Sequence, residues 1–106
     1  MTDQRARQRI NAIADRLKKD SHAQAVILFG SVGRGEASAE SDTDLLVIAP
    51  TRQRFCERSA TVLGLLRDLY PGLALEPIVL TPEEVQRRLE RGDPFVKDIM
   101  ESGVAL

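Results

Sequence analysis

The sequence predicts an α/β (α+β) fold in which a small mixed sheet of about three strands is flanked by helices. Two short apolar runs, 25–29 and 44–49, have the length of buried strands, and Gly30 and Pro50 close them. A third apolar run occupies 73–80. Segments with helical spacing or helix-capping residues lie before and after these runs, which favours helices packed on a sheet.

The first predicted helix covers 3–19, with Thr2 or Asp3 available as its N-cap. Its apolar residues recur at helical spacing: Ala6, Ile10, Ile13 and Leu17. The strand 25–29 follows, and a loop with room for one helical turn covers 31–41. The first half of the chain is therefore expected to be helix, strand and loop, followed by the second strand.

The next predicted helix begins with Thr51 as its N-cap and ends at Pro71–Gly72. Four residues define its expected apolar face: Phe55, Val62, Leu66 and Leu69. The third strand, 73–80, contains Pro77. Because proline has no backbone N–H to donate, this strand is expected at an edge of the sheet.

Two capping motifs predict the closing helices. "TPEE" at 81–84 combines an N-cap threonine, proline at the first helical position and Glu84 at the capping-box position. This helix should end near Gly92, where Asp93–Pro94 repeats the device for a last helix that ends at Gly103. The whole chain, 1–106, is expected to be a single domain.

Composition excludes several classes of protein. The formal net charge of -1 argues against a dedicated nucleic-acid surface, which would need excess positive charge. Cys56 is the only cysteine, so an internal disulfide and a cysteine-rich zinc site are excluded and a reducing, cytoplasmic setting is expected. The first twenty residues are too polar for a signal peptide, and no apolar run approaches a membrane span.

Asp42 and Asp44 are the first candidates for chemistry. Residues two apart on a strand project from the same face, so the two carboxylates converge if the strand reaches back to Asp42. Carboxylates that close repel each other unless a cation lies between them. Mg²⁺ prefers such oxygen ligands and completes its shell with water and phosphate oxygens.

The glycine-rich segment before them predicts a phosphate site. Gly30 ends the first strand, Ser31 follows at once, and Gly33 and Gly35 flank Arg34. Backbone N–H groups of glycines can approach a phosphate closely, and Ser31 and Arg34 add side-chain donors. A phosphate turn that faces paired carboxylates could hold a nucleoside triphosphate. It could also promote in-line displacement at phosphorus with the help of two metal ions about 3.5–4 Å apart.

Gly30–Ser31, a spacer of ten residues, and Asp42–Thr43–Asp44 together resemble the signature of the DNA polymerase β-like nucleotidyltransferase superfamily. The chain is most similar to its smallest branch, the minimal nucleotidyltransferases (MNT) of bacteria and archaea, which are antitoxin-type partners of helical HEPN toxins. The leading helix, the strand–turn–strand motif, the later strand and the closing "FVKDIMESGVAL" follow the family's order. The resemblance thus covers nearly the whole chain and implies the polymerase β-like fold.

The resemblance also implies roles for residues. Gly30 and Ser31 would hold the triphosphate, and Asp42 and Asp44 would be catalytic metal ligands. By position, Glu76 would be the third carboxylate, as a metal ligand or as the base that accepts the nucleophile's proton. The implied reaction is Mg²⁺-dependent transfer of a nucleoside monophosphate, AMP from ATP, onto an acceptor hydroxyl, which the analogy places on a HEPN-type toxin.

Two other functions stay open at this stage. The chain could be an antitoxin that blocks its partner by occlusion without turnover, because Glu76 replaces the more usual aspartate and Pro77 follows it directly. It could instead modify a small molecule, as related aminoglycoside-modifying enzymes do, and would then need a dimer partner or a further domain. The sequence leaves open whether the chain forms homo-oligomers, and Glu76 could also be an edge-strand surface residue.

Overall fold

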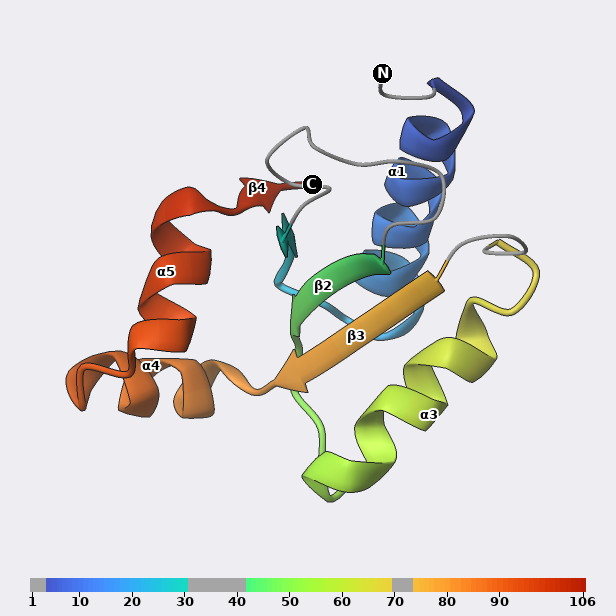
Figure 1. Cartoon of the computed structure of the whole chain (residues 1–106). Helices are drawn as coiled ribbons and strands as arrows, with labels where there is room; N and C mark the ends of the chain where they lie inside the picture. Colours follow the sequence, from blue (N-terminus) through green and yellow to red (C-terminus); the bar gives the residue numbers. More distant parts are fainter. Residues whose placement is uncertain (1–3, 31–41, 70–73) are drawn as a thin grey trace.

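A computed structural model of the chain describes residues 4–30, 42–69 and 74–106, and only the backbone of residues 4–6, 42 and 74. The elements follow one another as α1 (Gln4–Asp20), β1 (Ala25–Phe29), β2 (Asp42–Ile48), α3 (Phe55–Leu65), β3 (Ala74–Leu80), α4 (Pro82–Glu90), α5 (Pro94–Ser102) and β4 (Val104–Ala105) (Figure 1). The predicted mixed α+β class is confirmed. Within these described ranges, no helix has the length and apolar content that crossing a bilayer requires.

The sheet has the strand order β3-β2-β1-β4. β1 is antiparallel to both β2 and β4, whereas β2 and β3 are parallel. The sheet is therefore mixed, as expected, but it has a fourth strand that the sequence did not reveal. β4 pairs only with Ile27 and Leu28, and the next residue extends the contact by donating the Leu106 N–H to the Val26 carbonyl at 2.9 Å.

β3 lies at an end of the strand order, so the edge position predicted from Pro77 is confirmed. An edge strand tolerates proline because one side of its backbone needs no partner strand. The Pro77 carbonyl nevertheless has a partner, since the Ser59 hydroxyl of α3 donates to it at 2.9 Å. α3 thus covers part of this edge.

Each face of the sheet has its own hydrophobic core. Side chains alternate along a strand, so Leu45 and Val47 of β2 face one cluster while Leu46 and Ile48 face the other. The first cluster is completed by α1 and α3, and the second by α4 and α5. Figure 1 shows α1 and α3 on one side of the sheet and α4 and α5 on the other.

The predicted start of the helix after β2 was wrong. α3 begins at Phe55 with Arg54 as its N-cap, because the Thr51 hydroxyl accepts the Gln53 N–H at 3.1 Å and so closes a turn before the helix. Phe55 was also misplaced, since its side chain is exposed and its ring centre lies 5.9 Å from the Arg58 guanidinium carbon.

The rest of that helix agrees with the predicted face: Val62 and Leu66 are buried and Leu69 packs against the same cluster. α3 ends at Leu65, and the predicted stop at Pro71–Gly72 lies outside the described residues, as do the expected caps of α1, Thr2 and Asp3.

Both predicted capping motifs at the C-terminal end of the chain are confirmed. The Thr81 hydroxyl accepts the Glu84 N–H at 3.1 Å, and the Glu84 carboxylate accepts the Thr81 N–H at 2.7 Å. Asp93 caps α5 by accepting the Phe95 N–H at 2.9 Å. These bonds satisfy N–H groups that have no partner within the helix, so both helices start where the sequence predicted.

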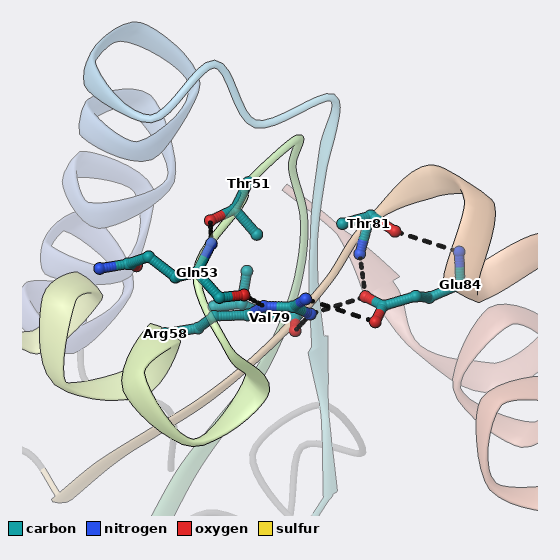
Figure 2. A network of polar contacts seen from close by, with 6 residues as sticks. All are labelled: Thr51, Gln53, Arg58, Val79, Thr81 and Glu84. Carbon is teal, nitrogen blue, oxygen red and sulfur yellow. Dashed lines mark hydrogen bonds and ion pairs between the residues drawn. The ribbon is translucent and has the colours of Figure 1, made fainter.

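The capping box of α4 is tied to α3 through Arg58, a contact that the sequence did not predict (Figure 2). Arg58 is only 8% exposed, and it donates to Glu84 at 2.6 and 3.3 Å and to the Val79 carbonyl at 3.1 Å. The Arg58 hydrogen bond lowers the pKa of Glu84 below its ordinary value. The network joins two helices across the end of β3, away from the start of β2.

Candidate functional site

Asp44 and Glu76 lie directly beside each other on neighbouring strands. The parallel register of β2 and β3 places Asp44 opposite Glu76 and Asp42 opposite Ala74. Neighbouring strands are about 4.8 Å apart and laterally paired residues share a face, so the two carboxylates emerge together. Asp44 is half-buried and Glu76 is exposed.

The carboxylates emerge on the α4/α5 side of the sheet. Along β2 this is the side of Leu46 and Ile48, and along β3 it is the side of Ile78 and Leu80. Asp44 and Glu76 therefore continue two apolar rows toward the N-terminal ends of β2 and β3. The apolar side chains further along β2 and β3 hold the backbone of the two acidic residues in place. Their carboxylates lie where the buried surface ends, so a ligand can reach them from solvent.

Gly30 leaves the space that the Asp44 carboxylate occupies. It follows β1 directly and has a φ of +79°, a conformation that favours glycine. A Cβ added at Gly30 would lie 2.5 Å from the Asp44 Oδ2. The same glycine that was predicted to let a phosphate approach therefore also lets the carboxylate lie against the backbone at the end of β1.

Phe29 is a neighbour of Asp44 that the sequence analysis missed. The antiparallel register of β1 and β2 pairs Phe29 with Asp44 directly. A signal was available, because Phe29 precedes Gly30, and a hairpin between the first two strands brings the end of one to the start of the other. The aspartate is thus flanked by an aromatic residue on one strand and by a glutamate on the other.

Other predicted site residues are described only in part. Ser31 and Arg34 lie outside the described residues, and for Asp42 the backbone position at the start of β2 is described but not the side chain. Among the described residues no group of three or more His, Cys, Asp or Glu side chains could hold a metal ion. The described part of the candidate site is therefore the pair Asp44 and Glu76 with the backbone of Gly30.

The donor atoms of this site fit a hard cation. Asp44 and Glu76 offer carboxylate oxygens, which are the ligands that Mg²⁺ prefers, and such ions are usually held by one or two carboxylates together with phosphate oxygens. The nearby end of β1 is free of a side chain at Gly30.

The chain matches the model of one protein family over most of its length. The model of the nucleotidyltransferase domain matches residues 10–106. The chain belongs to this family. The nucleotidyltransferase class predicted from the sequence is thereby confirmed, and general nucleotidyl transfer is the activity of the family.

One solved structure similar to this family member is a protein of Sulfolobus solfataricus described as a "putative nucleotidyltransferase". The two chains share 20% sequence identity, the similarity covers 82% of each chain, and the TM-score is 0.49. A search of the curated proteins found no match.

Proposed function

We propose that the chain is a Mg²⁺-dependent nucleotidyltransferase of the minimal type, which works in the cytoplasm and transfers AMP from ATP to a hydroxyl group of a partner protein. The observation that carries this proposal is the register that sets Asp44 beside Glu76, next to the Gly30 backbone. Nucleotidyl transfer requires carboxylates that hold metal ions next to the phosphates, and this pair is placed to supply two of them.

Each residue has a role in this proposal. Asp42, Asp44 and Glu76 would hold Mg²⁺, which neutralises phosphate charge when bound. Gly30 and Ser31 would hold the triphosphate, with Arg34 as a further donor to its oxygens. These contacts orient the α-phosphorus toward the incoming hydroxyl.

The proposed reaction is balanced without a further reactant. The acceptor oxygen forms a bond to the α-phosphorus, the bond from that phosphorus to the bridging oxygen breaks, and pyrophosphate leaves. Glu76 is placed either to complete the metal-binding set or to accept the hydroxyl proton. Its lateral pairing with Asp44 supports the metal-binding role. Its exposed position on an edge strand also lets an acceptor on another molecule approach it.

The proposed acceptor is a tyrosine hydroxyl of a helical HEPN-type toxin, with this chain as the antitoxin. The resemblance to the minimal nucleotidyltransferases suggests this partner. The exposure of Glu76 is compatible with it, since a protein-borne hydroxyl has to reach the carboxylates from outside.

The test is to incubate the chain with ATP labelled at the α-phosphate, Mg²⁺ and the product of the neighbouring gene. Asp44→Asn should abolish label transfer. Asp15→Asn is the matched control, because it makes the same change at an exposed position on α1 and should leave transfer intact. Absence of label with the unaltered chain would contradict the enzymatic proposal. If the chain then still protects cells from the toxin by forming an unlabelled complex with it, the antitoxin acts by occlusion instead.

A further inference from the structure

Two phenylalanine rings lie next to the candidate site. Phe29 pairs with Asp44 across β1 and β2, so both side chains project from the α4/α5 face. The Phe29 ring meets the ring of Phe95, near the start of α5, with 5.8 Å between the ring centroids and an angle of 87° between the ring planes. An aromatic surface therefore extends from the aspartate toward α5.

Phe95 is exposed although its backbone is firmly held. Pro94 occupies the first turn of α5, and the Asp93 carboxylate accepts the Phe95 N–H at 2.9 Å. Phe95 is nevertheless 45% exposed. Because the backbone of Phe95 is already held, a flat ligand that covers the ring has to order only its side chain.

The geometry of the ring pair leaves a stacking surface. In an edge-to-face pair only one ring presents a face to the other, so at least one face of Phe95 is not covered by Phe29. The exposed fraction of Phe95 shows that solvent reaches this ring. The other strongly exposed phenylalanine, Phe55, differs because it lies on α3, at the opposite side of the sheet, beside Arg58.

We propose that the Phe95 ring stacks against the nucleobase of the donor nucleotide. The inference rests on the proposed function, which places the triphosphate at Gly30, the residue that follows Phe29. A nucleotide whose phosphates lie at Gly30 and Asp44 can extend its base along the Phe29–Phe95 surface on the same face. The site then takes its binding energy from stacking in addition to the phosphates.

Stacking also sets the specificity of this subsite. Every base has a π-face, so stacking on an aromatic ring tolerates different bases and carries no hydrogen-bond code. Purines cover more of a ring than pyrimidines do. Stacking on Phe95 should therefore favour the ATP and GTP analogues over the CTP analogue only modestly and discriminate little between adenine and guanine.

The experiment measures binding by calorimetry with Mg²⁺ present. The ligands are the α,β-methylene analogues of ATP, GTP and CTP, together with inorganic tripolyphosphate, which has the phosphates without a base. The proteins are the full chain, Phe95→Leu, Phe95→Tyr and the control Phe55→Ala. Leucine keeps an apolar contact with Phe29 and removes the aromatic ring, and thermal unfolding checks that each variant is folded.

Phe95→Leu should weaken binding of the ATP and GTP analogues about tenfold and leave tripolyphosphate binding unchanged. Phe95→Tyr and Phe55→Ala should bind like the unaltered chain. Equal nucleotide affinity in Phe95→Leu, or an equal loss for tripolyphosphate, would overturn the stacking proposal while the proposed function stands. If the unaltered chain binds neither nucleotide nor tripolyphosphate, the proposed function fails as well.

Discussion

Replacing Gly30 by alanine should damage the site more than the fold. The φ of +79° costs an L-residue about 1–2 kcal/mol, and each kcal/mol lowers the melting temperature of a domain of this size by about 4–8 °C. The added Cβ would also lie 2.5 Å from the Asp44 Oδ2. Because a carboxylate is the flexible end of its side chain, it turns away instead of unfolding the sheet.

Displacement of Asp44 should appear as a loss of ligand binding. Disturbing the groups that orient a metal ligand typically costs about 10- to 100-fold in metal affinity. We expect a loss of this size for the Mg²⁺ complex of the α,β-methylene ATP analogue, measured by calorimetry on Gly30→Ala. Thermal unfolding of the same samples gives the stability change.

Gly92→Ala separates the effect of a positive φ on stability from the effect of displacing Asp44 on ligand binding. Gly92 has a φ of +74°, close to that of Gly30, but a Cβ there would meet no atom within 4 Å. This variant should lose a similar amount of stability and keep its nucleotide affinity. The reasoning is refuted if Gly30→Ala binds the analogue as tightly as the unaltered chain, or if Gly92→Ala loses affinity to the same extent.

Three further predictions concern stability, followed by thermal or denaturant unfolding. Because Arg58 lowers the folded-state pKa of Glu84, their ion pair stabilises the chain above about pH 4.5, and this stabilisation is lost as the pH falls below that value. Glu84→Gln should therefore make the free energy of unfolding depend less on pH in the acid range. An unchanged pH dependence would show that the pair contributes little. Gly103→Ala should destabilise the chain by about 1–3 kcal/mol, since its Cβ would lie 2.5 Å from the Ile99 carbonyl oxygen, and a stability equal to that of the unaltered chain would argue against this packing. Gly64→Ala, inside α3 with no atom within 4 Å of its Cβ, should stabilise by about 0.5–1 kcal/mol, and a lowered melting temperature would contradict this.

Local signals predicted most of the described elements. The capping box at Thr81, the cap at Asp93 and the edge position of Pro77 each depend on the chemistry of neighbouring residues, and each is confirmed. The predicted N-cap at Thr51 was wrong because a threonine hydroxyl can close a turn as well as cap a helix. Which of the two forms depends on the backbone conformation of the residues that follow. β4 has two residues, too few to show any periodicity.

Two residues of α3 have surroundings that the sequence of the helix does not reveal. Arg58 has the sequence appearance of a solvated helix residue, yet it is buried because Glu84 and the Val79 carbonyl satisfy its donors. Phe55 has the appearance of a core residue but is exposed beside Arg58. The burial of Arg58 depends on Glu84 and Val79, which lie more than twenty residues further along the chain, so no pattern within α3 encodes it.

The sequence suggested residues for the candidate site but not how they are arranged. Asp44 could be singled out from its spacing to Asp42 and Gly30. The position of Glu76 beside Asp44 depends on the parallel register of two strands separated by a helix, which the sequence does not specify locally. The approach of the Asp44 carboxylate to Gly30 follows from packing at the end of β1.

The most direct measurement is a titration with Mn²⁺ in place of Mg²⁺, in which electron paramagnetic resonance reports the ions bound by the protein and the ATP analogue together, relative to the analogue alone. Asp44→Asn and Glu76→Gln should each weaken binding of the ion, because the two carboxylates are laterally paired on β2 and β3. The matched exposed changes Asp15→Asn and Glu101→Gln should not. Mn²⁺ binding that is unaffected by either site variant would contradict the assignment of Asp44 and Glu76 as a metal-binding pair.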